Sequence, residues 1–271
     1  MARLVVVLRS VVRGFVVLVE KRPRTRQERA EWLHRLCERV LRKLEIQVDA
    51  VGSFPDHGAM ISNHLSYLDI FVLASLRRCV FVSKAEVESW PLIGWVTTMV
   101  GTVYVARGHG GSAIKAREGM RDALDAGLPV VFFPEGTTSN GSGLLKFHSG
   151  LLAQVLAEGA PVSAALIHYS LAEDNGADVT AGNDVCYWGD RNMWAHIFKL
   201  LGLRGLRAEV RFAGEPIGFA PGAAADRKRA ALEARAAVAA LGGRMDEGDG
   251  SCRSGGTESC TISDSTNVHL P

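Results

Sequence analysis

The sequence predicts an α/β fold: a single domain with a mixed, largely parallel sheet flanked by helices, preceded by an N-terminal amphipathic helical hairpin. Three observations support this. Short β-like runs alternate with helical stretches from about residue 51 onward. The first 50 residues form two stretches with helical periodicity and one apolar face each. The length of 271 residues suits one domain. We therefore divide the chain into segments 1–50, 51–243 and 244–271.

Composition and charge narrow the class of protein. Hydrophobic residues make up 47% of the chain and charged residues 22%, which excludes a largely disordered protein. The net charge of +2 is unevenly distributed along the chain, because residues 1–50 alone carry 12 Lys/Arg and 6 Asp/Glu. Positive charge beside apolar helical sequence favours an anionic membrane surface over nucleic acid. Five cysteines without metal or redox spacing indicate a reducing, cytoplasmic setting.

Residues 4–19 are strongly apolar but contain Arg9 and Arg13, with Glu20 just beyond. These three fall in one narrow sector of a helix and leave a broad apolar face. The stretch is too short and too charged for a spanning helix, which needs about 20 apolar residues, and it lacks the features of a secretory signal. A second helix at 27–44 also has one apolar side. We expect this hairpin to make segment 1–50 a peripheral or monotopic membrane anchor at the cytoplasmic face; the alternative is that both helices pack on the domain.

The remaining elements follow in order along the chain. Strands are predicted at 59–62, 79–83, 102–106, 130–133, 161–169 and 208–212. Helices are predicted at 68–76, 91–99, 112–126, 150–158, 191–203 and 223–241. This alternation indicates parallel pairing, and ligands usually bind at the carboxyl ends of such strands. Residues 244–271 are rich in Gly, Ser, Thr and Asp, lack periodicity and are expected to be disordered.

The first strand is followed by Asn63 and His64, and then by an apolar run of helical length. Ser66 occupies a predicted N-cap position with Asp69 three residues on, which is capping-box spacing. In one regular helix, His64 and Asp69 would point about 140° apart, so they can meet only if the chain bends between them. A histidine held by a carboxylate is a general base with its tautomer fixed. The alternative is that Asp69 only completes the helix cap.

Two further strands also deliver polar residues at their ends. Residues 101–107 read Gly-Thr-Val-Tyr-Val-Ala-Arg, and the guanidinium of Arg107 matches phosphate oxygens, although a solvated arginine is the alternative. Residues 130–139 read Val-Val-Phe-Phe-Pro-Glu-Gly-Thr-Thr-Ser. There Glu135 and Gly136 open a turn, and glycine allows the backbone to approach a ligand closely. Lys84 ends another predicted strand.

Three of these segments, in this order, resemble the motifs of the glycerolipid (1-acyl-sn-glycerol-3-phosphate) acyltransferase family. They are Asn63-His64-x-x-x-x-Asp69, the Gly-x-x-x-Val-x-Arg block that ends at Arg107, and Phe-Pro-Glu-Gly-Thr at 133–137. The likeness extends loosely to about residue 217. The chain departs from the pattern at Thr138, where enzymes acting on lysophosphatidic acid typically carry arginine. It departs again at Ala164, where a proline is usual.

The resemblance implies transfer of a fatty acyl group from an acyl thioester, carried by coenzyme A or acyl-carrier protein, to the hydroxyl of lysophosphatidic acid. His64 would be the general base and Asp69 would orient it. The residues implied in binding the acceptor are Lys84, Arg107, Glu135, Gly136 and Thr137. No cofactor and no metal are expected. Because position 138 is Thr, another lysolipid, such as a lyso-ornithine lipid or a lysophospholipid diester, is the alternative acceptor.

Two other functional classes fit parts of the sequence. A hydrolase would use the same His/Asp pair to direct water onto a thioester, and product analysis with and without lysolipid distinguishes it. A non-catalytic lipid-binding module would keep its function after His64→Ala. Arg107 and the turn at 135–137 suit an anionic acceptor and favour the acyltransferase.

Overall fold

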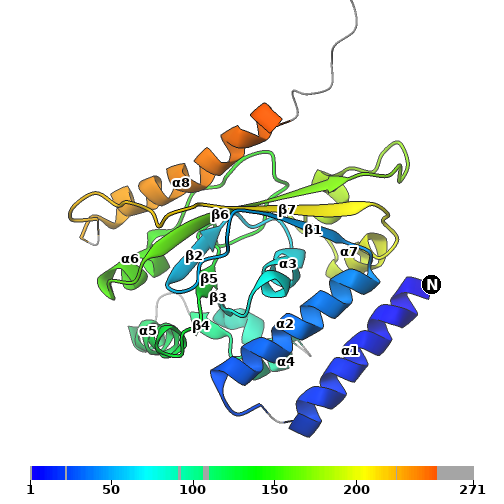
Figure 1. Cartoon of the computed structure of the whole chain (residues 1–271), viewed down its shortest axis with the longest axis horizontal. Helices are drawn as coiled ribbons and strands as arrows, with labels where there is room; N and C mark the ends of the chain where they lie inside the picture. Colours follow the sequence, from blue (N-terminus) through cyan, green and yellow to red (C-terminus); the bar gives the residue numbers. More distant parts are fainter. Residues whose placement is uncertain (1, 22, 91–92, 106–109, 224, 249–271) are drawn as a thin grey trace, which may run out of the picture.

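The computed structural model describes residues 2–21, 23–90, 93–105, 110–223 and 225–248 (Figure 1). Its α-helices are α1 (Ala2–Lys21), α2 (Arg26–Lys43), α3 (Leu68–Leu76), α4 (Ile93–Met99), α5 (Gly110–Asp125), α6 (Ser149–Ala157), α7 (Met193–Leu200) and α8 (Arg227–Gly248). Its strands are β1 (Gln47–Val51), β2 (Ala59–Ser62), β3 (Val80–Lys84), β4 (Val103–Val105), β5 (Val130–Phe132), β6 (Val162–Leu171) and β7 (Leu206–Phe212). A 3-10 turn at Ala85–Ser89 and a π-helical turn at Ala181–Val185 complete the elements.

The strands form one seven-stranded sheet in the order β1-β7-β6-β2-β5-β3-β4. The five strands from β6 to β4 run parallel to one another. The β6–β7 pair is antiparallel, and β1 then pairs parallel with β7. The sheet is thus mixed and largely parallel, and the predicted α/β fold class is confirmed.

Helices cover both faces of the sheet (Figure 1). On one face, α2, α3 and α7 contribute buried residues to a core that includes Met60 and Ile167. On the other face, α5, α6 and α8 enclose a second core around Phe132 and Leu152, both fully buried. Strands buried on both faces are expected to be continuously apolar, and β2 and β5 have no exposed residue.

The N-terminal hairpin is present as two antiparallel helices side by side (Figure 1). A capping box between Thr25 and Glu28 starts α2. The apolar side of α2, which includes Trp32, Leu36 and Val40, is buried in the core shared with α3. The expectation that the apolar sides of both helices face a membrane is therefore wrong for α2, whose apolar side packs on the domain.

Helix α1 has two different faces. Its inner face packs on α2, where Leu18 is fully buried and the carbonyl of Gly14 accepts a hydrogen bond from Trp32 Nε1 at 3.0 Å. A Cβ at position 14 would lie only 2.8 Å from a methyl carbon of Leu36, so a larger residue here would make the Leu36 side chain move. The outward face carries four valines that are each about half exposed. They are Val5, Val12, Val16 and Val19.

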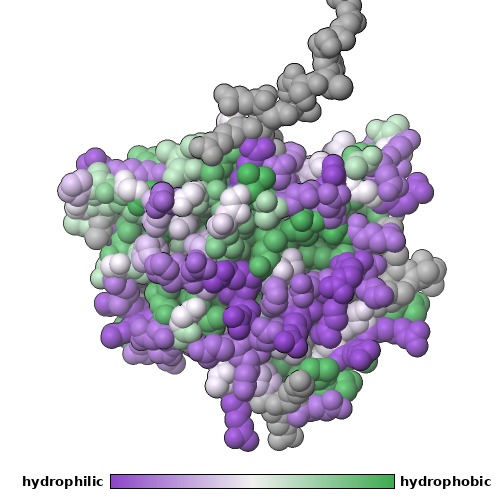
Figure 2. Space-filling model, in the orientation of Figure 1, coloured by the Kyte–Doolittle hydropathy of each residue, from purple (hydrophilic) through white to green (hydrophobic). Residues whose placement is uncertain are grey.

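The four exposed valines of α1 lie on a surface that is partly hydrophilic and partly apolar. Figure 2 shows this side of the molecule as hydrophilic surface interrupted by apolar areas, one of them at the lower edge, where Figure 1 places α1. Among the described residues, no helix combines the length and hydropathy needed to cross a membrane.

Most predicted elements are found within a few residues of their expected bounds, and two differences matter. Strand β1 was not predicted, and it contains the expected boundary at residue 50. Helix α8 continues to Gly248, so the first five residues of the segment expected to be disordered, 244–248, are helical. The rest of that segment, 249–271, lies outside the described residues.

Candidate active site

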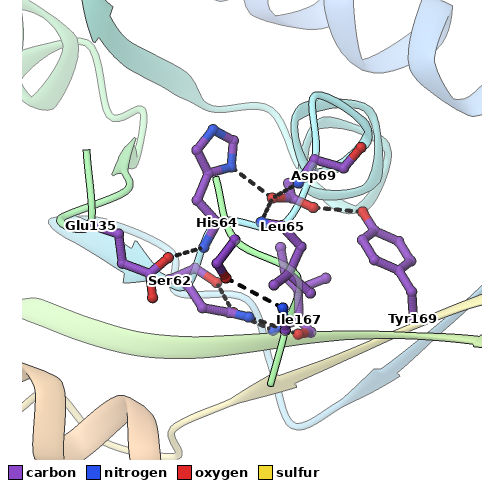
Figure 3. A network of polar contacts seen from close by, with 11 residues as sticks. Ser62, His64, Leu65, Asp69, Glu135, Ile167 and Tyr169 are labelled. Carbon is purple, nitrogen blue, oxygen red and sulfur yellow. Dashed lines mark hydrogen bonds and ion pairs between the residues drawn. The ribbon is translucent and has the colours of Figure 1, made fainter. Parts of the chain in front are cut away.

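The predicted catalytic turn follows the carboxyl end of β2 and lies at one edge of the sheet. Because β2, β5 and β3 are parallel, the turns after them open at this same edge. His64 follows β2, Glu135 follows β5, and Lys84 ends β3. Strand β6 continues past β2, since Ser62 pairs with Ala165 and β6 ends only at Leu171. Its second half therefore runs beside the turn that carries His64 (Figure 3).

His64 and Asp69 form a direct hydrogen bond, with 2.7 Å between Nδ1 and Oδ2 (Figure 3). The bend predicted between them is present, because α3 begins only at Leu68. The side chain of Asp69 is fully buried, whereas that of His64 is 19% exposed. Bonding at Nδ1 leaves Nε2 as the nitrogen able to take a proton, and Figure 3 shows it directed away from Asp69.

Asp69 accepts hydrogen bonds from three further donors. The backbone N–H groups of Leu65 and Ser66 bond to Oδ2 at 2.7 and 3.0 Å. The hydroxyl of Tyr169 bonds to Oδ1 at 2.7 Å. A buried carboxylate needs such partners to remain charged. These donors and the imidazole together hold the Asp69 carboxylate in one orientation.

The expected capping box is only half formed. Asp69 accepts from the Ser66 N–H as the motif requires. However, the N-cap of α3 is Tyr67, which makes no side-chain cap bond, and within the described chain the buried Ser66 hydroxyl has no hydrogen-bond partner. The prediction that Ser66 caps α3 is wrong, because the Asp69 carboxylate already organises both preceding N–H groups.

The backbone of His64 is held on both sides by the turn that follows β5. Its N–H donates to Glu135 Oε2 at 3.0 Å, and its carbonyl accepts from the Ser139 N–H at 2.9 Å. The imidazole also stacks on the ring of Phe133, with centroids 3.9 Å apart and planes 8° from parallel. Backbone bonds and stacking together restrict His64 to one orientation.

Asn63 ties the catalytic turn to β6. Its Nδ2 donates to the carbonyl of Ile167 at 2.9 Å, and its Oδ1 accepts from the Ile167 N–H at 2.7 Å. The Ser62 hydroxyl also donates to Oδ1, at 3.1 Å. Asn63 thus pairs with both backbone groups of Ile167, much as a ladder partner would, and extends the β2–β6 connection beyond the end of β2.

Glu135 has a different position from the one expected of an acceptor-binding group. It is 2% exposed, and its second oxygen, Oε1, accepts from the Leu145 N–H at 2.9 Å. Burial raises the pKa of Glu135 above its ordinary value, while its backbone donors oppose this shift. Both oxygens are occupied by backbone groups, so Glu135 supports the turn beneath His64.

The other predicted binding residues are placed differently from one another. Lys84 is exposed, and in the sheet it pairs with Val105, the last residue of β4. Arg107 lies outside the described residues. Gly136 has a φ of +65°, as a glycine turn requires, but its N–H bonds to the carbonyl of Phe133 rather than pointing at a ligand. Thr137 is exposed.

A hollow of about 810 Å³ lies elsewhere, beside β4. Its basic lining residues are Arg24, Arg26, Arg29 and Lys115. His64 does not line this hollow, so the histidine held by a carboxylate, rather than the hollow, marks the candidate active site.

The sequence did not predict the contact between Tyr169 and Asp69, or the supporting roles of Asn63 and Glu135. Tyr169 reaches Asp69 from 100 residues away, and nothing in the local sequence distinguishes it from other inward-facing residues of a strand. Asn63 and Glu135 were recognised as motif positions, but their use as backbone supports depends on which strands are neighbours.

Comparison with known proteins places this arrangement in a family. The family model described as Acyltransferase matches residues 45–167. A lyso-ornithine lipid O-acyltransferase from Pseudomonas aeruginosa is 36% identical over 209 residues, which cover 76% of this chain and 75% of that protein. The chain belongs to the acyltransferase family.

Two further relatives of this acyltransferase differ in how much they share. A 1-acyl-sn-glycerol-3-phosphate acyltransferase from Neisseria meningitidis is 33% identical, and the match covers 55% of this chain and 61% of that protein. The solved structure of PlsC from Thermotoga maritima, a 1-acyl-sn-glycerophosphate acyltransferase, aligns with a TM-score of 0.57 over 89% of this chain and 96% of that one. At 19% identity, the latter establishes a shared fold.

Proposed function

We propose that this acyltransferase moves a fatty acyl group from an acyl thioester, carried by coenzyme A or acyl-carrier protein, to the free hydroxyl of a lysolipid. The observation that carries the proposal is the 2.7 Å hydrogen bond between His64 and the buried Asp69. It leaves Nε2 of a partly exposed imidazole as the general base. Two backbone hydrogen bonds, the stacking on Phe133 and the bond to Asp69 fix the orientation of the ring.

The proposed reaction needs no protein nucleophile. His64 Nε2 takes the proton of the acceptor hydroxyl while that oxygen attacks the thioester carbonyl. The carbon–sulfur bond breaks, and the leaving thiolate takes the proton back from the imidazolium. Asp69 stabilises the imidazolium in between and remains ionised, as a buried carboxylate beside a catalytic histidine does in hydrolases of unrelated fold.

We place a lyso-ornithine lipid first as acceptor and lysophosphatidic acid second. The P. aeruginosa relative named for the ornithine lipid matches more of this chain than the Neisseria relative named for the phosphate lipid. Thr138 is neutral and half-buried at the position where an arginine would suit a phosphate monoester. An ornithine headgroup, which carries one carboxylate and one ammonium group, requires less positive charge from the protein.

The experiment that tests the reaction compares single-turnover acyl transfer by the full chain and by two histidine variants. His64→Ala should slow the reaction by about 10² to 10⁴, the usual contribution of a general base. The matched control is His57→Ala, which alters an exposed histidine in the loop before β2, away from the carboxyl edge of the sheet. Wild-type rates for a folded His64→Ala would refute the mechanism.

The acceptor is tested in the same assay with equal concentrations of the two lysolipids and one acyl donor. Acylation of the lyso-ornithine lipid at least tenfold faster than lysophosphatidic acid is the expected result. The reverse preference would restore lysophosphatidic acid as the acceptor. Release of free fatty acid without acylation of either lipid would instead indicate a thioester hydrolase.

A further inference from the structure

We propose that Tyr169 is a positioning residue of the active site, which sets the basicity of His64 by binding the far oxygen of Asp69. The inference rests on the proposed function. Tyr169 lies on β6 just past residue 167, where the match to the family model ends. Its hydroxyl bonds to Asp69 rather than to His64, so its effect on the imidazole passes through the carboxylate.

The fold brings Tyr169 to this place by strand register. Its neighbour in the antiparallel β6–β7 pair is Ala208, which is fully buried. Side chains two apart on a strand share one face, so Tyr169 and Ile167 both point into the core under α3. Asp69 lies in the first turn of α3, and the Tyr169 ring therefore enters from the side opposite His64 (Figure 3).

The two oxygens of Asp69 have different partners. Oδ2 faces the His64 ring and two backbone N–H groups, whereas Oδ1 accepts from the Tyr169 hydroxyl at 2.7 Å. A donor on Oδ1 withdraws negative charge from Oδ2 and also fixes the rotation of the carboxylate. Without it, more negative charge would face the imidazole, and the imidazolium would be more stable.

The other titratable groups around Asp69 support this reading. Tyr169 is 3% exposed, and burial holds its pKa well above the ordinary value, so the hydroxyl keeps its proton and can only donate to the carboxylate. Burial also raises the pKa values of Tyr67 and Cys186, the latter to about 12, so both are neutral at working pH. Glu135 is a further acidic group that interacts electrostatically with the pair.

The main test is Tyr169→Phe in the full chain, with the rate of acyl transfer measured as a function of pH. The variant should be slower by about tenfold, and the acidic limb of its pH–rate profile should move upward by up to about one pH unit, as expected for one hydrogen bond to a charged group. The direction follows because a stronger negative charge at Oδ2 makes His64 release its proton at higher pH.

A matched control and a second variant sharpen the test. Tyr187→Phe removes the hydroxyl of a partly buried tyrosine, which donates to the carbonyl of Arg191 at 2.9 Å, and should leave the pH profile unchanged. Site-specific 3-fluorotyrosine at position 169 keeps the ring and makes the hydroxyl a stronger donor. It should therefore shift the acidic limb downward, opposite to Tyr169→Phe, and it decides the question if Tyr169→Phe fails to fold.

A folded Tyr169→Phe with the pH profile of the wild type would overturn the inference, as would a 3-fluorotyrosine enzyme with an unshifted limb. Either result together with an inactive His64→Ala would leave the proposed function standing. Full activity of His64→Ala would remove both.

Discussion

Glu135 holds the backbone of the catalytic turn through both of its carboxylate oxygens. Its place in a motif suggested contact with the acceptor, but its side chain is only 2% exposed and instead holds the backbone of His64 in place. The neighbouring Thr137 and Lys84 are exposed and remain candidate contacts for the lipid headgroup. Burial alone therefore separates the supporting residue from those available to a ligand.

Replacing Glu135 by glutamine should weaken both stability and activity. An amide has one oxygen, so its NH₂ group must face either the His64 or the Leu145 N–H, and one buried donor loses its acceptor. We expect the free energy of unfolding to fall by about 1–3 kcal/mol, and turnover to fall because His64 shifts. Urea unfolding and an activity assay measure the two effects, with the exposed Glu86→Gln as control.

The same variant has a predicted pH dependence. Because burial raises the pKa of Glu135 above 4.5, the folded state binds this proton more tightly than the unfolded state. The contribution of Glu135 to stability is thus largest below pH 4.5 and declines as the pH rises through the raised pKa. The stability gap between wild type and Glu135→Gln should narrow over that range, and a gap that widens would contradict the assignment.

At the scale of elements, α1 and α2 were both predicted as helices with one apolar face, but they differ in what they bury. The apolar side of helix α2 is buried in the core beside α3. Helix α1 packs on α2 through Gly14 and Leu18, and its four outward-facing valines are exposed. Removing both helices would expose the core of the domain. A test of membrane binding must therefore change only the outward face of α1.

We predict that changing Val5, Val12, Val16 and Val19 together to threonine releases the protein from anionic vesicles. Threonine keeps the β-branched shape, so the helix should be retained. If each exposed valine contributes on the order of 0.5 kcal/mol at the interface, binding should weaken by more than tenfold. Vesicle flotation measures this, and the remaining binding should weaken further as salt rises.

Leu232→Thr is the control for that experiment, because Leu232 is 69% exposed on α8, which covers the opposite face of the sheet. Undiminished binding of the valine variant would place the anchor elsewhere. Helix α7 would be the next candidate, since Trp194 and Phe198 are each 59% exposed one turn apart.

At the scale of the whole molecule, the two faces of the sheet have different relations to the site. The face under α3 includes the side chains that hold Asp69, whereas the face under α6 and α8 only supports the strands. Each face offers one fully buried leucine whose replacement can test this difference: Leu73 on α3 and Leu152 on α6.

Leu73→Ala and Leu152→Ala should each lower the free energy of unfolding by about 2–5 kcal/mol. Below the melting temperature, Leu152→Ala should keep its turnover, while Leu73→Ala should lose it. The shorter side chain at position 73 leaves a cavity between α3 and the core, and this cavity allows Asp69 to move relative to His64. Thermal unfolding followed by circular dichroism, together with turnover at low temperature, separates stability from activity. Equal turnover in the two variants would show that the site tolerates movement of α3.

Much of the fold could be read from the sequence because it depends on local pattern. Helix α3 and strand β2 have the bounds that the sequence pattern predicts, and the fully buried strand β5 is a continuous apolar run. Strand β1 was missed because it is short, only two of its five residues are even partly buried, and it carries no strong apolar run. The strand order, including the antiparallel β6–β7 pair, carries no local signal.

The sequence by itself determined the pair at the centre of the site. His64 and Asp69 are five residues apart, and a turn before a helix is sufficient to join them. Only the tertiary structure decided what surrounds that pair: Asn63 pairing with β6, Glu135 under the backbone, and Tyr169 on the far carboxylate oxygen. A contact within one turn depends on local backbone geometry, whereas a contact across about 70 to 100 residues depends on which strands pair and in which register.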